Sequence, residues 1–158
     1  MSSLLVITSV EKLQKEINKK VKSFGKLPGI YVSLNKTQES TENLLKKSGI
    51  NTKKLFFIDC VTSKKTREDV LHISPNELEL LSTAIKSFID DIRGDKFLVI
   101  DALSTLLIYN SENEVARFAK KVTEHAARKD VKIIDYIPKT KAQELLNMIV
   151  IFVDKVKK

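Results

Sequence analysis

A carboxylate at the end of an apolar run is the side chain of this sequence best placed to do chemistry. Phe97–Ile100 is a run of four apolar residues, and Asp101 follows it directly. Such a run is typical of a buried strand, and ligands of open α/β sheets bind at the carboxyl ends of the strands. Nucleotide-hydrolysing folds use a strand-end aspartate of this kind to hold magnesium beside the phosphates. Asp101 is therefore the first candidate site residue.

Asp101 also has a purely structural interpretation, which the sequence leaves open. A strand-end carboxylate can hold a neighbouring loop by accepting hydrogen bonds from backbone N–H groups. The flanking signals support the strand in either case. Gly94-Asp95 ends the helix before it, and Ser111-Glu112-Asn113-Glu114 is a capping box that begins the helix after it.

The segment around Asp101 resembles the Walker B segment of the RecA/KaiC-like ATPases of the archaeal type. In that family an apolar strand runs into Asp, a small residue, Leu and Ser, which here are Asp101, Ala102, Leu103 and Ser104. Three further segments resemble the family's second strand, its next helix-to-strand passage and a late strand ending in Val-Asp: Pro28–Leu34, Ile50–Asp59 and Met148–Val156. The resemblance implies a RecA-like fold and makes Asp101 a Walker B-like remnant.

The phosphate-binding loop of the family is missing after the first strand. Leu4–Thr8 is predicted to be a buried strand, and Thr8-Ser9-Val10-Glu11 is a capping-box pattern that begins a helix at once. The family places a glycine-rich loop ending in Lys-Ser/Thr here, which holds the nucleotide phosphates. No glycine precedes Gly25, and the Gly25-Lys26 pair is followed by Leu27. We therefore expect no Walker A site, and Glu11 in the first helical turn would repel phosphate.

A second part of the family's hydrolytic machinery is replaced as well. After the second strand the active relatives place an acidic residue that polarises the attacking water. This chain has Asn35 at that position, and an amide cannot accept a proton at neutral pH. The resemblance therefore implies a degenerate domain with no catalytic residue, that is, a pseudo-ATPase rather than an enzyme.

The first helix offers a candidate anion-binding face. It is predicted from Val10 to about Phe24, with a core stripe of Val10, Leu13, Ile17, Val21 and Phe24. At ~100° per residue the opposite face carries five lysines: Lys12, Lys15, Lys19, Lys22 and Lys26. A solvated helix face is the simpler interpretation, and binding of nucleic acid or another polyanion is the functional one. The face has no aromatic residue to stack on a base, which argues against single-stranded nucleic acid.

Composition limits the remaining classes of function. The formal net charge of +8 lies entirely within the first 65 residues, which can mark an anionic partner or simply favour solubility. With 42% apolar and 30% charged residues and no apolar run of ~20, the chain is expected to be a cytoplasmic globular protein without a membrane partner. Met1–Ile7 lacks the basic leader and cleavage site of a signal peptide. Cys60 is the lone cysteine, and His72 and His125 have no ligand-spaced partners, so neither a metal nor a cofactor is expected.

Two other α/β sites are disfavoured by the residues present. A phospho-receiver could use Asp59 and Lys139, but it needs an acidic pair where this chain has Thr8-Ser9-Val10. A dinucleotide site needs G-x-G-x-x-G, which four scattered glycines cannot supply. The polar segment from Val61 to Glu68, with Ser63 and Thr66, is a possible anion loop and more simply a solvent loop.

The predicted elements alternate between strand and helix along the whole chain. Beyond those above, we predict these segments: helix Thr37–Lys47, strand Leu55–Asp59, short strand Val70–Ile73, a helix begun by Ser74-Pro75, strand Lys132–Ile137, a short helix over Lys141–Leu146 and a last strand over Met148–Val153. This alternation predicts a three-layer α/β/α sandwich with a mostly parallel sheet, formed by residues 1–158 as one degenerate RecA/KaiC-like domain without a P-loop.

The function that follows is interaction rather than catalysis. We expect a regulatory or protein-interaction module that binds a protein partner or associates with itself. The alternative is a nucleic-acid-binding protein that uses the basic first helix.

Overall fold

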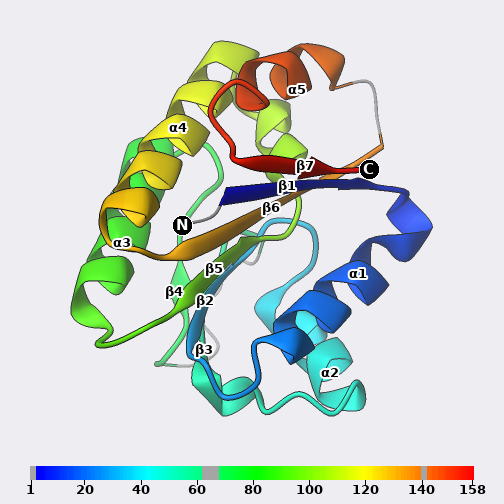
Figure 1. Cartoon of the computed structure of the whole chain (residues 1–158), viewed down its shortest axis with the longest axis vertical. Coiled ribbons are helices and arrows are strands. Elements are labelled where there is room, and N and C mark those ends of the chain that lie inside the picture. Colours follow the sequence, from blue (N-terminus) through cyan, green and yellow to red (C-terminus); the bar gives the residue numbers. More distant parts are fainter. Residues whose placement is uncertain (1–2, 62–67, 140–141) are drawn as a thin grey trace.

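The computed structural model describes residues 3–61, 68–139 and 142–158. Within them a parallel sheet has the strand order β4-β3-β2-β5-β6-β1-β7 (Figure 1). Its strands are β1 (Ser3–Thr8), β2 (Gly29–Ser33), β3 (Leu55–Asp59), β4 (Leu71–His72), β5 (Phe97–Ile100), β6 (Lys132–Pro138) and β7 (Lys155–Lys157). All neighbouring pairs run parallel, so the carboxyl ends of these strands meet at one edge.

Helices cover both faces of the sheet, which confirms the predicted α/β/α class (Figure 1). They are α1 (Val10–Ser23), α2 (Gln38–Lys47), α3 (Leu78–Asp91), α4 (Glu112–Arg128) and α5 (Gln143–Ile149), with short 3-10 turns η1 (Thr52–Lys54) and η2 (Leu103–Ile108). Helices α1 and α2 pack on one face, and α3, α4 and α5 on the other.

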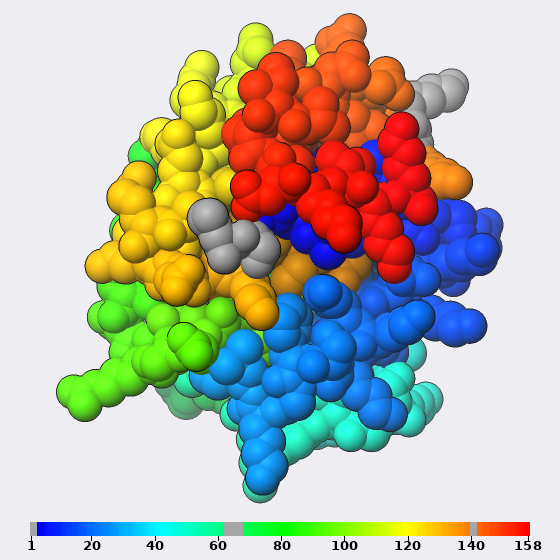
Figure 2. All heavy atoms as spheres, viewed as in Figure 1, coloured from blue at the N-terminus to red at the C-terminus, as the bar shows by residue number. Residues whose placement is uncertain are grey.

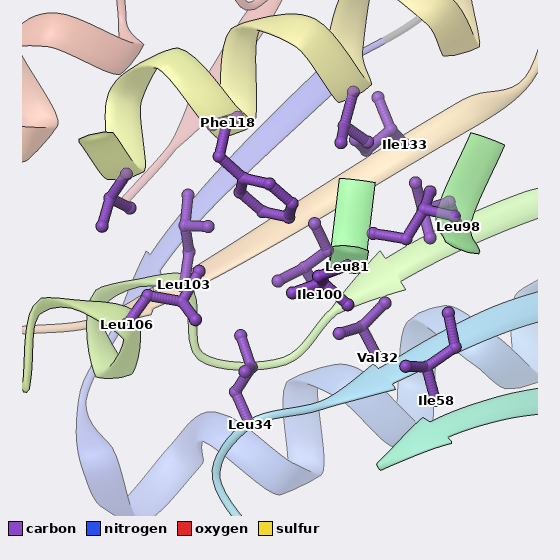
Figure 3. Packing of buried hydrophobic residues seen from close by; sticks show 14 of the residues in the cluster. Val32, Leu34, Ile58, Leu81, Leu98, Ile100, Leu103, Leu106, Phe118 and Ile133 are labelled. Carbon is purple, nitrogen blue, oxygen red and sulfur yellow. The ribbon is translucent and has the colours of Figure 1, made fainter. Parts of the chain in front are cut away.

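The alternation of side chains along each strand divides the core into two clusters. On β2, Ile30 and Val32 face the α3–α4–α5 layer, whereas Tyr31 faces α1 and α2. The larger cluster joins Ile30 and Val32 to Leu98 and Ile100 of β5 and to Phe118 of α4 (Figure 3). Every residue of β2 and β5 is buried, as expected for central strands of a parallel sheet.

Glycine at position 29 is required by this packing. The Phe97 ring occupies the space that a Cβ at Gly29 would need, because β2 and β5 pair Gly29 with Phe97. The same ring stacks on Phe24, with ring centroids 4.2 Å apart. The end of α1 is thereby anchored on the sheet.

The first helix differs from its prediction at both ends. Ser9 is the N-cap, but its side chain makes no capping hydrogen bond, so the predicted capping box is wrong. Val10 is 64% exposed and does not belong to the core stripe. The helix ends at Ser23, which places Lys26 in the turn that follows rather than on the helix.

The helix predicted to begin at Ser74-Pro75 begins later, at Leu78. The Ser74 hydroxyl donates to the Asn76 side chain, and the Glu77 N–H donates to the Ser74 carbonyl oxygen at 3.0 Å. These bonds form a turn in place of a first helical turn. By contrast, the capping box at Ser111 is confirmed, with both of its hydrogen bonds to Glu114 present.

The predicted last strand over Met148–Val153 is wrong. Met148 and Ile149 are the end of α5, and the final strand is Lys155–Lys157. Leu145 and Ile149, one helical turn apart, are fully buried against the core, whereas Ile151 is 83% exposed. The apolar run Met148–Val153 is therefore not one strand, because its first two residues end α5 and the residues after them form a turn.

Candidate functional site

The Asp101 carboxylate lies at the carboxyl edge of the sheet, where β5 and β2 are neighbours. Its Oδ1 accepts hydrogen bonds from the Leu34 N–H at 2.7 Å and the Asn35 N–H at 3.2 Å. Only 1% of Asp101 is exposed, and burial raises its pKa to about 7, although the two N–H donors and the nearby Lys36 act to lower the pKa. The structure thus brings Asp101 and Asn35 together, with Asp101 holding the turn that follows β2.

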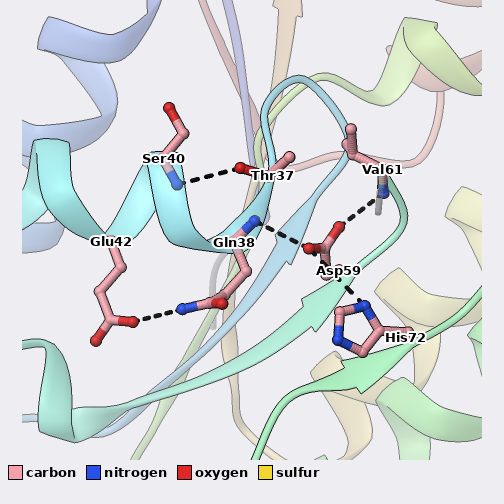
Figure 4. A network of polar contacts seen from close by, with 7 residues as sticks. All are labelled: Thr37, Gln38, Ser40, Glu42, Asp59, Val61 and His72. Carbon is pink, nitrogen blue, oxygen red and sulfur yellow. Dashed lines mark hydrogen bonds and ion pairs between the residues drawn. The ribbon is translucent and has the colours of Figure 1, made fainter. Parts of the chain in front are cut away.

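A second carboxylate, Asp59 at the end of β3, holds the far end of the segment that connects β2 to α2 (Figure 4). Its Oδ2 accepts from the Gln38 N–H at 3.0 Å, and its Oδ1 accepts from the Val61 N–H at 2.7 Å. His72 of β4 places Nδ1 3.9 Å from Oδ2. Asp59 is 2% exposed, so this carboxylate anchors the start of α2 and is poorly placed for a phosphoryl acceptor.

The junction between β1 and α1 is a single residue long. Thr8 ends the strand, Ser9 is the N-cap and Val10 begins the helix. The Thr8 carbonyl oxygen accepts from the Lys139 N–H at 2.7 Å, which ties the end of β1 to the residue after β6. A hollow of about 250 Å³ lies beside this junction, with Lys12, Lys139 and Lys157 among its lining residues.

The five predicted lysines are all exposed, and they differ in their surroundings. Lys12 and Lys19 line hollows beside β1, whereas Lys15, Lys22 and Lys26 line none of the hollows described for this structure. The hollows beside β1 also contain lysines outside the predicted lysine face: Lys20, Lys132, Lys139, Lys155, Lys157 and Lys158. These come from α1, from β6 and the residue after it, and from β7 and the residue after it, which lie far apart in the sequence.

Asp135, in the middle of β6, was not among the predicted site residues. It is 1% exposed, and neither of its carboxylate oxygens has a hydrogen-bond partner among the described residues. Burial raises its pKa to about 7. A signal was present in the sequence, since Asp135 interrupts a strand that is otherwise apolar from Ile133 to Ile137.

Other chemistry is restricted in the described part of the chain. It contains no group of three or more His, Cys, Asp or Glu side chains that could hold a metal ion. Burial raises the pKa of Cys60 to about 12, which disfavours the reactive thiolate. None of the described helices is both long and apolar enough to cross a membrane. Ser63 and Thr66 of the possible anion loop lie outside the described residues.

Comparisons with known proteins agree with this fold. A family model described as the KaiC ATPase matches residues 14–129. An uncharacterised protein from Pyrococcus horikoshii, crystallised with an unknown peptide, superposes with a TM-score of 0.72 at 15% identity, covering 98% of this chain and 76% of that one. A KaiC-like protein from the same organism superposes with a TM-score of 0.67 at 14% identity, covering 98% and 69%. At these identities the structural likeness shows the fold alone, and a comparison with curated proteins finds no significant match.

Proposed function

This chain belongs to the KaiC ATPase family, and we propose that it is a member without ATPase activity, which acts as a regulatory or protein-interaction module. The β1–α1 junction carries the proposal. A single residue, Ser9, separates the strand from the helix, so no backbone loop exists there to surround a phosphate. Glu11 in the first turn of α1 places a negative charge at the helix end that would face phosphate.

The remaining acidic position supports the same proposal. Asp101 Oδ1 already accepts two backbone N–H bonds, and burial favours the neutral form of its carboxyl group. A magnesium ion bound to nucleotide needs an ionised carboxylate that is open to the ligand. Asn35, on the neighbouring turn, cannot act as a general base. These residues do not fit a site that binds and hydrolyses a nucleotide.

Surface features of the described chain support interaction with another protein. The exposed large apolar side chains include Ile108 (71%) and Tyr109 (59%) at the end of η2 and Ile151 (83%) after α5. One similar structure, the uncharacterised P. horikoshii protein, was crystallised with an unknown peptide. We therefore propose a polypeptide as the class of partner.

A phosphate-release assay with magnesium and ATP tests the proposal. The expected result is no turnover above a blank for the wild-type protein, with an active ATPase as positive control. Turnover that Asp101→Asn abolishes would overturn the proposal. The matched variant Asp95→Asn, which changes an exposed carboxylate just before β5, distinguishes a loss of chemistry from a contaminating activity.

Nucleic-acid binding is the second candidate function, favoured by the exposed lysines of α1. Lys15 and Lys22 on the helix and Lys26 in the next turn have no ion-pair partner among the described residues. If they contact phosphates, their joint replacement by Glu removes oligonucleotide binding, and wild-type binding weakens steeply with salt. Fluorescence anisotropy with duplex and single-stranded oligonucleotides measures both. Salt-insensitive or absent binding would reject this candidate.

A further inference from the structure

A groove runs along the sheet between α1 and β7. Three hollows of about 250, 260 and 790 Å³ adjoin one another there, since all three share Lys157 as a lining residue. Leu4 and Val6 of β1 lie on its floor. Figure 2 shows this hollow from the outside, with β1 recessed between β7 and the end of α1. We call it the β7 groove.

The β7 groove exists because α1 leaves part of its own face of the sheet uncovered. Leu4 and Val6 of β1 face the α1 layer, and β7 pairs Lys155 with Leu4 and Lys157 with Val6. Paired residues of neighbouring strands point to the same face, so the side chains of both lysines lie on the α1 side of the sheet. Val156 points to the other face, where it packs against the α3–α4–α5 cluster.

The groove carries a large surplus of positive charge. Six of its lysines come from three elements and the residue after β6: Lys19, Lys20, Lys132, Lys139, Lys155 and Lys157. Its two acidic residues are already engaged. Glu16 lies 3.5 Å from Lys157 Nζ, and the Asp154 carboxylate accepts the Ser3 N–H at 2.9 Å. Charge complementarity therefore favours an anionic partner.

The floor and edge of the groove favour a polypeptide over a nucleic acid. Bases bind by stacking on exposed aromatic rings, but Phe24 is stacked on Phe97 and Tyr136 is 1% exposed. Within the described residues β7 pairs with β1 alone, so the backbone groups on its outer side are open to a further strand. A peptide can supply that strand, whereas a nucleic acid has no backbone amides to do so.

The two faces of β7 also define the sequence pattern of the partner. In a strand added beside β7, alternate side chains point to the α1 face, where Lys155 and Lys157 lie. The intervening side chains point to the face of Val156 and the turn after α5, where Ile151 is exposed. We propose that the β7 groove binds an extended polypeptide segment in which acidic and apolar residues alternate. This inference rests on the proposed function, because it names the partner of that interaction module.

Fluorescence anisotropy at low and moderate salt tests the proposal on the full chain. The probes are a labelled peptide of alternating glutamate and valine, a peptide of the same composition with its glutamates and valines in two separate blocks, and a single-stranded oligonucleotide. The alternating peptide is expected to bind most tightly. Lys155→Glu with Lys157→Glu is expected to weaken its binding by about tenfold or more, the equivalent of about 1.4 kcal/mol.

Lys47→Glu with Lys120→Glu is the matched control, because it makes the same change in charge at exposed lysines of α2 and α4. This pair is expected to leave peptide binding nearly unchanged. An equal loss of binding in the two double variants would show that net charge alone explains the effect and would overturn the proposed site. Amide hydrogen exchange supplies a direct readout, with Lys155–Lys157 protected by the alternating peptide.

Tighter binding of the oligonucleotide or of the block peptide, or no binding of the alternating peptide, would overturn the inference. The ATPase assay measures phosphate release and does not depend on peptide binding. A negative result for the β7 groove can therefore be distinguished from a negative result for the proposed function.

Discussion

Replacing Asp135 by Asn should make the stability of the protein much less dependent on pH. In the folded chain the carboxyl group is buried without a hydrogen-bond partner among the described residues, and burial raises its pKa from 3.8 to about 7. The folded state therefore keeps the proton over a range of pH in which the unfolded state has already released it. Stability falls as pH rises from about 4 to about 7, because the folded state binds more protons there, and the loss is complete above the folded pKa.

The size of this effect follows from the difference between the two pKa values. One pKa unit corresponds to about 1.4 kcal/mol, so a change from 3.8 to about 7 corresponds to about 4 kcal/mol. This is a large share of the 5 to 15 kcal/mol, in rough terms, that holds a typical domain folded. Asn has the shape of the protonated carboxyl group and no charge to lose, so the variant escapes this penalty.

Urea denaturation of the wild type and Asp135→Asn at about pH 5 and about pH 8 measures the effect. Near pH 5 the variant should already be more stable by about 1 to 2 kcal/mol, because most unfolded chains have lost the Asp135 proton at that pH whereas the folded chain keeps it. Near pH 8 the variant should be more stable by a few kcal/mol, of the order worked out above. Asp101 also has a raised pKa, but it contributes equally to both profiles and cancels in the difference. Parallel pH profiles for the two proteins would refute the reasoning and show that Asp135 is ionised in the folded state.

Three further predictions concern stability, each measured by denaturation at fixed pH. Asp101→Ala should cost about 1 to 3 kcal/mol, because it leaves the Leu34 and Asn35 N–H groups without their acceptor; an unchanged midpoint would return Asp101 to the functional interpretation. Gly29→Ala should cost about 1 to 3 kcal/mol, because its Cβ would overlap the Phe97 ring, and a neutral result would mean that the strands separate freely. Ser111→Ala should cost about 1 kcal/mol through loss of the capping box, provided that α4 keeps its length by circular dichroism.

The central strands could be predicted because each is a short apolar run between clear turn signals. The prediction of Leu55–Asp59 has the observed bounds, and the same pattern predicts the observed strand Phe97–Ile100. The run that begins at Met148 fails because periodicity does not separate a short buried strand from the end of a buried helix. Its outcome depends on Leu145 and Ile149 reaching the core together, which is a tertiary effect.

The β7 groove could not be predicted for a topological reason. β1 lies between β6 and β7 although it comes first in the chain, so lysines near both termini line one surface. A helical projection of α1 selects Lys12 and Lys19, but it cannot place Lys155 or Lys157 beside them. The sequence shows only that the first 65 residues hold the charge excess, not that residues after 130 share the surface.

The carboxylates at the strand ends show why a Walker B-like pattern alone does not establish magnesium chemistry. β2 lies between β3 and β5, and the aspartates that end those two neighbours both accept backbone N–H groups from the connection after β2. Asp101 holds Leu34 and Asn35, and Asp59 holds Gln38 at the start of α2. The connection that carries the hydrolytic acid in active relatives is thus fixed from both sides. A strand-end aspartate that accepts two backbone N–H bonds is explained by that connection, and nucleotide binding needs evidence of its own.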